Sequence, residues 1–138
     1  MKEVTLIVLH CSATREDKRY TAEDCRRDHV LNNKWQDMGY HYYIELDGTL
    51  KNGRPVGVEG AHCKYHNRHS IGICLEGGLD RDGQFADTRT DRQRATLKEL
   101  LGRLKTVYPK ALIVAHHELN PSKYCPCFDV SEYRQMFG

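Results

Sequence analysis

The sequence has no long hydrophobic run and no strong excess of charge of either sign. No stretch approaches the roughly 18 consecutive apolar residues of a membrane-spanning helix, so we expect no membrane insertion. The formal net charge of +2 is too small to predict binding to nucleic acid. Internal repeats, low-complexity tracts and flexible linkers are also lacking, which predicts one domain over residues 1–138. We expect that domain to be a monomer.

The N-terminus carries few features of a secretory signal peptide. Its apolar run is short and ends at His10 and Cys11 instead of a small-residue cleavage site. We therefore expect the protein to be cytoplasmic as synthesised, where reduced thiols and metal ligation are commoner than disulfides. Cys25 and Cys74 lie in apolar-patterned segments and are predicted to be small buried hydrophobic residues. Cys125 stands apart from them, in a polar loop.

Strand and helix patterns alternate along the chain. Short apolar or aromatic runs predict strands at residues 4–9, 41–46, 70–75 and 111–115, the second of which turns at Asp47-Gly48 into a hairpin. Helices are predicted at 22–33, from the capping residue Thr90 to Tyr108-Pro109, and at 130–136. The helix after Thr90 has one apolar stripe of leucines, at positions 97, 100, 101 and 104. The interleaving predicts an α/β fold, a single domain with a central mixed β-sheet flanked by helices.

Two of the predicted buried strands end in histidine, at His10 and His116. Ligand crevices of α/β sheets form at the carboxyl ends of strands. Cys125 follows nine residues after His116, in the loop PSKYCPC. Two imidazoles and one thiolate can hold Zn²⁺ tetrahedrally and leave a fourth position open for water, as catalytic zinc sites do.

Five short motifs occur in one order around these residues: LHCSAT (9–14), GYHY (39–42), SIGICL (70–75), AHHE (115–118) and KYCPCFD (123–129). Together they resemble the type 2 N-acetylmuramoyl-L-alanine amidases, the family of small phage lysozymes and animal peptidoglycan recognition proteins. The resemblance covers the chain from about Val4 to Asp129. It implies a peptidoglycan amidase that binds one Zn²⁺ per chain.

The resemblance implies specific roles for several residues. It makes His10, His116 and Cys125 the zinc ligands, and Tyr40 and Lys123 the catalytic residues. Many family members read Gly-His-Arg-Asp where this chain reads Ala-His-His-Glu, so His117 remains a rival to His116. We prefer His116, because successive strand side chains point to opposite faces.

The implied reaction is hydrolysis of the amide between the lactyl group of muramic acid and L-alanine. Zinc lowers the pKa of a bound water, Lys123 stabilises the oxyanion, and Tyr40 hydrogen-bonds the water or the carbonyl. The loop at residues 61–69 resembles the family's loop beside the zinc, which makes His62 and Asn67 candidate contacts to the peptide stem or sugar. Glu118 is read as a hydrogen-bonding neighbour of a histidine, outside the catalytic set.

Two other functions remain open from the sequence. One is a non-catalytic module that binds peptidoglycan without cutting it. The other is a structural zinc or redox protein that uses Cys125 together with Cys127. The lack of a predicted signal peptide and of a separate wall-binding domain suits a phage or prophage endolysin, which waits in the cytoplasm and acts on the cell wall after release.

Overall fold

A five-stranded mixed β-sheet lies at the centre of the structure, a computed structural model that describes residues 3–138. The strand order is β4-β3-β5-β1-β7, and neighbouring strands run parallel except for β4, which is antiparallel to β3. The strands are β1 (Leu6–Cys11), β3 (Tyr42–Ile44), β4 (Leu50–Asn52), β5 (Ser70–Leu75) and β7 (Leu112–Ala115). The predicted hairpin and the predicted central strand at residues 70–75 are confirmed.

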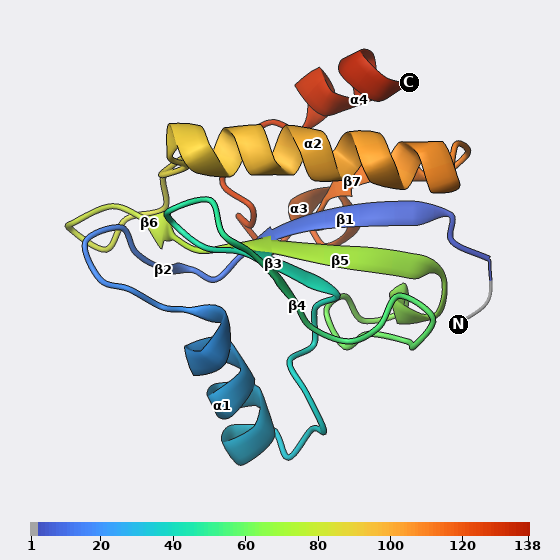
Figure 1. Cartoon of the computed structure of the whole chain (residues 1–138). Coiled ribbons are helices and arrows are strands. Elements are labelled where there is room, and N and C mark those ends of the chain that lie inside the picture. Colours follow the sequence, from blue (N-terminus) through green and yellow to red (C-terminus); the bar gives the residue numbers. More distant parts are fainter. Residues whose placement is uncertain (1–2) are drawn as a thin grey trace.

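Helices cover both faces of this sheet (Figure 1). The long helix α2 (Asp91–Val107) runs over one face, with α4 (Ser131–Phe137) packed beside it, and α1 (Ala22–Asn32) lies on the other side. Two short helical segments complete the chain, the 3-10 turn η1 (Asn67–His69) and α3 (His116–Leu119). This arrangement confirms the predicted α/β class, with a mixed sheet flanked by helices.

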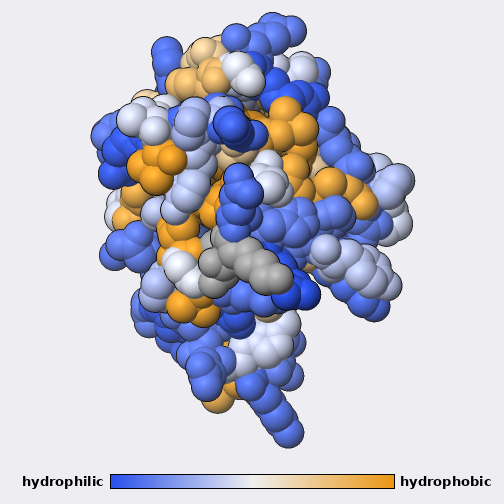
Figure 2. Space-filling view, turned by 90° about the vertical axis from the view of Figure 1, so that its right-hand side faces the viewer, coloured by the Kyte–Doolittle hydropathy of each residue, from blue (hydrophilic) through white to orange (hydrophobic). Residues whose placement is uncertain are grey.

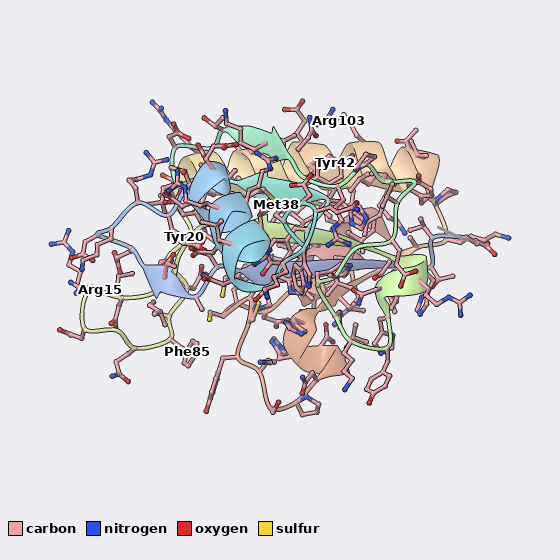
Figure 3. The ribbon with its side chains drawn as sticks, turned by 90° about the horizontal axis from the view of Figure 1, so that it is seen from below. Arg15, Tyr20, Met38, Tyr42, Phe85 and Arg103 are labelled. Atoms are coloured by element: carbon pink, nitrogen blue, oxygen red, sulfur yellow. The ribbon has the colours of Figure 1, made fainter. Side chains whose placement is uncertain are left out.

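The main core lies between α2 and the sheet. The predicted leucine stripe of α2, at positions 97, 100, 101 and 104, is buried there against Ile7, Leu9, Ile71 and Ile73. A second, smaller cluster lies on the α1 side and includes the buried thiols of Cys25 and Cys74, as predicted. Figure 3 looks onto that side, where the labelled Met38 lies beside α1.

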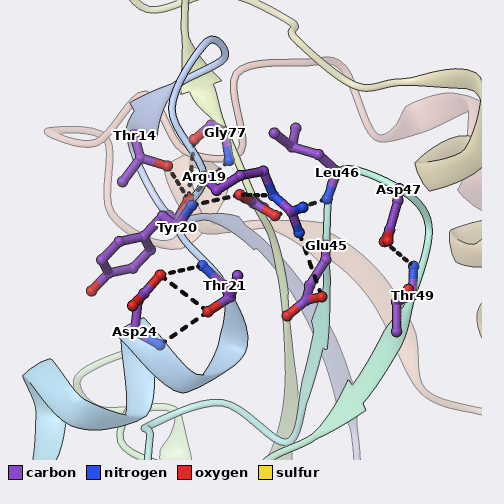
Figure 4. Close-up of polar contacts among 12 residues, drawn as sticks. Thr14, Arg19, Tyr20, Thr21, Asp24, Glu45, Leu46, Asp47, Thr49 and Gly77 are labelled. Carbon is purple, nitrogen blue, oxygen red and sulfur yellow. Dashed lines mark hydrogen bonds and ion pairs between the residues drawn. The ribbon is translucent and has the colours of Figure 1, made fainter.

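Capping side chains begin the two longest helices. The Thr21 hydroxyl accepts a hydrogen bond from the Asp24 amide, and the Asp24 carboxylate accepts one from the Thr21 amide (Figure 4). Thr90 and Gln93 form the same reciprocal pair at the start of α2. Each pair satisfies amide groups that the first helical turn leaves without partners, so both predicted helix starts are confirmed.

Several short elements were not predicted from the sequence. A small parallel sheet pairs β2 (Thr14–Arg15) with β6 (Gly78–Leu79), and α3 begins directly after β7. Two-residue strands and a four-residue helix contain less than one period of any hydrophobic pattern, which explains why periodicity missed them. The first strand also extends farther than predicted, to Cys11, because His10 and Cys11 continue the pairing with Cys74 and Leu75.

A buried carboxylate, Glu76, joins three segments near the end of β5. Its Oε2 accepts hydrogen bonds from the Tyr20 amide at 2.6 Å and from Arg19 Nε at 3.2 Å, and its Oε1 accepts one from the Leu46 amide at 2.8 Å. The side chain is fully buried. Glu76 therefore fixes the segment before α1 to the end of β3.

We expect Glu76→Ala to lower the free energy of unfolding by about 2–4 kcal/mol, because the Tyr20 and Leu46 amides lose their acceptor. Urea unfolding measures the change. Glu132→Ala is the control, since the Glu132 carboxylate is 51% exposed and its loss is expected to cost less than about 0.5 kcal/mol. Equal effects of the two substitutions would contradict a structural role for Glu76.

The described surface is polar for the most part. On the face shown in Figure 2, hydrophilic side chains predominate and apolar ones form separate patches. Among residues 3–138, no helix combines the length and the hydropathy that crossing a bilayer requires.

Candidate metal centre

His10 reaches the site because it lies near the end of a central strand. Ile7 and Leu9 point into the main core beneath α2. Since strand side chains alternate between faces, His10 points to the opposite face. It is almost completely buried there, beside the rings of Tyr40, His62 and His116.

Three potential metal ligands converge at this point. His10 Nδ1 lies 3.1 Å from His116 Nδ1, and the ligand atoms of His10, His116 and Cys125 all lie within 4.8 Å of one another. The Cys125 sulfur is held beside the strand end by the Cys11 amide, which donates to it at 2.8 Å. Of the sequence-predicted ligands, the structure thus brings together all three.

The donor set and its spacing fit a zinc ion. Two imidazole nitrogens bound to one tetrahedral zinc at 2.0–2.1 Å lie about 3.3 Å apart, close to the separation of the two Nδ1 atoms. Two nitrogens and one thiolate are also ligands that zinc prefers, and three protein ligands leave a fourth position for water. The same residues can therefore hold Zn²⁺ in an open site.

A chain of hydrogen bonds orients the His10 ring. The Ser70 hydroxyl donates to the His66 carbonyl at 2.6 Å, so it accepts from His62 Nε2 at 3.1 Å. That assigns the proton of neutral His62 to Nε2 and leaves its Nδ1 to accept from His10 Nε2 at 2.9 Å. His10 consequently carries its proton on Nε2 and presents the lone pair of Nδ1 to His116 and Cys125.

Gly72 makes room for this chain. A Cβ at position 72 of β5 would lie 2.5 Å from His62 Cγ, closer than real side chains approach. The His62 ring therefore packs directly against the backbone of Gly72, the glycine of the SIGICL motif. The adjacent His41 is fixed as well, because its Nδ1 accepts from the Gly72 amide at 3.0 Å and its Nε2 donates to the Val58 carbonyl at 2.8 Å.

The environment keeps the histidines of the site neutral. Burial, with smaller contributions from His62 and His116, holds the pKa of His10 well below its usual value. Burial and His41 lower the pKa of His62 to about 3, and burial and Lys123 lower that of His116. Neutral imidazole is the form that binds a metal and the form that the hydrogen-bonded chain requires.

The side chains of His116 and His117 point in different directions, as predicted, but the cause is not strand alternation. Strand β7 ends at Ala115, and both histidines lie in the first turn of α3, where consecutive side chains also point in different directions. His116 faces His10, whereas His117 hydrogen-bonds the Cys125 carbonyl through its amide at 3.0 Å and its Nδ1 at 3.1 Å. His117 therefore anchors the cysteine loop.

Glu118 lies outside the group of ligands. Its Oε1 accepts hydrogen bonds from the Ala115 amide at 2.8 Å and from Arg134 Nη1 at 2.7 Å. The carboxylate thus ties the start of α3 to α4, and these bonds take the place of the predicted hydrogen bond to a histidine.

Tyr40 and Lys123 line the same hollow as the three ligands. The Tyr40 ring lies 5.2 Å from the His10 ring, centroid to centroid. Burial, followed by the neighbouring Cys74 thiol, raises the pKa of Tyr40 well above its usual value, so the phenol keeps its proton. The Lys123 amide donates to the Asn120 carbonyl at 3.0 Å, which holds the lysine at the rim of the hollow.

The two predicted substrate contacts, His62 and Asn67, have structural partners. Both nitrogens of His62 are engaged by His10 and Ser70. Asn67 Oδ1 accepts from the amides of His62 and Cys63, at 2.9 Å each, and so closes the loop. Both residues also line a second hollow beside the site, with His116 and Lys123, so contact with a substrate stays a prediction.

Phe85 and Tyr124 form a stacked pair at the edge of the hollow that sequence reasoning missed. Their ring centroids lie 4.6 Å apart with an interplanar angle of 23°, and both residues are more than half exposed. Figure 3 shows Phe85 on the loop after β6. The loop that carries Phe85 is otherwise rich in polar residues, and a single aromatic residue in such a loop gives no signal of its partner.

Comparison with known proteins shows which family has this arrangement. The sequence profile of N-acetylmuramoyl-L-alanine amidases matches residues 1–128. The chain belongs to this family. An endolysin of Escherichia phage T7 is 40% identical over 127 residues, which span 92% of this chain and 83% of that protein. An endolysin of Enterobacteria phage K11 is 38% identical over 132 residues, spanning 96% and 86%.

The fold of this amidase agrees with a solved member of the same family. The amidase LysC from Clostridium intestinale URNW matches it with a TM-score of 0.82 at 26% identity, over 97% of this chain and 85% of LysC. The resemblance inferred from the five motifs is thus confirmed in both sequence and structure.

Proposed function

We propose that the chain is a zinc-dependent N-acetylmuramoyl-L-alanine amidase, an endolysin that cleaves the lactyl–L-alanine amide of bacterial peptidoglycan. The convergence of His10, His116 and Cys125 on one point is the observation that carries the proposal. A thiolate and two neutral imidazoles match the preferences of Zn²⁺, and the open fourth position separates a catalytic site from a structural one.

Zinc at such a site supplies a Lewis acid that polarises a carbonyl and lowers the pKa of a water from about 15.7 towards 7. The protein's own groups would do the rest. The Lys123 ammonium, at the rim of the hollow, is placed to stabilise negative charge that develops on the amide oxygen. The Tyr40 phenol stays protonated and is suited to donate a hydrogen bond to the substrate carbonyl.

Peptidoglycan as the substrate and the cell wall as the place of action are supported by the similarity to phage endolysins over almost the whole chain. A muramyl peptide extends from its scissile amide in two directions, as a sugar and as a peptide. The hollow around the ligands and the hollow beside Asn67 share His62, His116 and Lys123 in their linings. That adjacency supports the predicted contacts of His62 and Asn67 with one arm of the substrate.

Metal removal tests the zinc dependence. We expect the purified protein to contain one zinc per chain by elemental analysis, to lose its activity on cell walls after dialysis against a chelator, and to regain it with added Zn²⁺. Full activity of metal-free protein would contradict the proposal.

We expect His62→Gln to weaken zinc binding roughly 10- to 100-fold, because His10 loses the acceptor that fixes its proton on Nε2. Competition with a chromophoric chelator measures the affinity without any use of activity. The control is His69→Gln on the same segment, since His69 Nδ1 is hydrogen-bonded to Thr5 Oγ1 at 2.7 Å instead. An unchanged zinc affinity in His62→Gln would contradict a role of His62 in orienting the His10 ring.

A further inference from the structure

Two thiols that the proposed reaction does not use touch each other beside the ligand group. Cys11 Sγ lies 3.8 Å from Cys127 Sγ, which is a contact distance between sulfur atoms. One residue ends β1 directly after His10, and the other follows Cys125 by two positions. The pair therefore connects the two segments that carry the proposed metal ligands.

The two cysteines line different hollows. Cys11 lines the hollow of the ligand group, whereas Cys127 lines the adjoining hollow with Phe85, Phe128 and His117. Cys11 is buried and Cys127 is half-buried. A small oxidant can thus reach Cys127 from solvent, with Cys11 directly behind it.

The backbone holds both residues in place, so the side chains alone would move. The Cys11 amide donates to Cys125 Sγ at 2.8 Å, and the Cys127 amide donates to the Tyr124 carbonyl at 2.8 Å. A disulfide bond is about 2.05 Å long, so the sulfurs have about 1.8 Å to close. Rotation about the Cα–Cβ bonds is the motion available to them.

We propose that Cys11 and Cys127 are a redox-active pair that peroxides convert into a disulfide. Hydrogen peroxide oxidises Cys127 to a sulfenic acid, as its O–O bond breaks and one water is released. The Cys11 sulfur then attacks the Cys127 sulfur, the S–S bond forms, and the hydroxyl leaves as a second water. The two thiols together lose two protons and two electrons, which reduce the peroxide.

The cross-link ties the end of β1 to the cysteine loop without consuming a metal ligand. It restricts the unfolded chain, because the bridged residues are far apart in the sequence, and so it raises the thermal stability of the fold. This consequence stands on the thiol pair and does not depend on amidase activity.

Mapping of the oxidised protein tests the proposal. Zinc-loaded and chelator-treated protein are treated with hydrogen peroxide, unfolded, alkylated and digested. We expect two fewer alkylated cysteines than in the reduced protein, a peptide that links Cys11 to Cys127, and a melting temperature higher by about 5–10 °C that dithiothreitol reverses. Cys127→Ser is expected to abolish the link and the temperature shift while it leaves zinc content and activity unchanged.

Three results would overturn the proposal. They are a full set of alkylated cysteines after oxidation, a link that joins Cys125 to either thiol, and a lower melting temperature of the linked protein. Each is distinct from failure of the zinc proposal, which elemental analysis of the reduced protein reports separately.

Discussion

Cys125→Ser is expected to abolish stoichiometric zinc binding and to lower kcat/KM on the order of a thousandfold, because several kcal/mol of charge stabilisation are lost with the metal. The serine hydroxyl stays protonated at neutral pH and is a poor zinc ligand, whereas the cysteine supplies a thiolate. The Cys11 amide that holds the Cys125 sulfur at 2.8 Å would hold the serine oxygen too, so the fold should survive.

The matched control for this substitution is Cys127→Ser, two residues away. The Cys127 sulfur contacts Cys11 and lies outside the group formed by His10, His116 and Cys125. We expect Cys127→Ser to have the same zinc content, by elemental analysis, and the same rate of cell-wall hydrolysis as the unsubstituted protein. If Cys125→Ser kept both its zinc and its activity, the assignment of the metal site would be wrong.

The second large effect is expected at Lys123. Lys123→Met keeps most of the apolar stem but removes the ammonium from the rim of the hollow, so we expect kcat to fall roughly 100- to 1000-fold, the usual cost of one lost oxyanion partner. Zinc content should not change, since the lysine is not a ligand. Steady-state kinetics on a soluble muramyl peptide separates kcat from KM.

Lys110→Met is the control for Lys123, because Lys110 is an exposed charge in the turn between α2 and β7. An unchanged kcat in Lys123→Met, or an equal loss of kcat in Lys123→Met and Lys110→Met, would show that Lys123 is a solvated loop charge without a catalytic role. A rise in KM alone would assign it to binding in place of the chemical step.

The group of His10, His116 and Cys125 could be predicted from the sequence because a strand is recognised from a few consecutive residues. The runs that precede His10 and His116 are apolar and β-branched, and strands of one parallel sheet end at a common edge. That reasoning selected the residues that the structure brings together, even though His116 begins a helix instead of ending a strand. The first turn of α3 is what directs the His116 side chain towards His10. A helix of four residues is too short to show a hydrophobic period in the sequence, so this direction could not be predicted.

The surroundings of the ligands could not be foreseen, since they depend on contacts between distant segments. Ser70, His62 and His10 form one hydrogen-bonded chain only because the loop before β5 folds back over Gly72. The sequence offered His62 as a polar loop residue and, through the family resemblance, as a candidate substrate contact, but gave no sign of its hydrogen bond to His10. The contact between Cys11 and Cys127 has the same origin, because it joins positions at opposite ends of the chain.

The central claim is that this amidase cuts one particular bond, and the products of digestion test it most directly. Zinc-loaded protein is incubated with purified bacterial peptidoglycan, and the released groups are labelled and identified by mass spectrometry. The account predicts new L-alanine amino termini and glycan strands whose muramic acid carries a free lactyl carboxylate, both absent with Cys125→Ser. Binding of the zinc-loaded protein to the wall without release of L-alanine amino termini would contradict it.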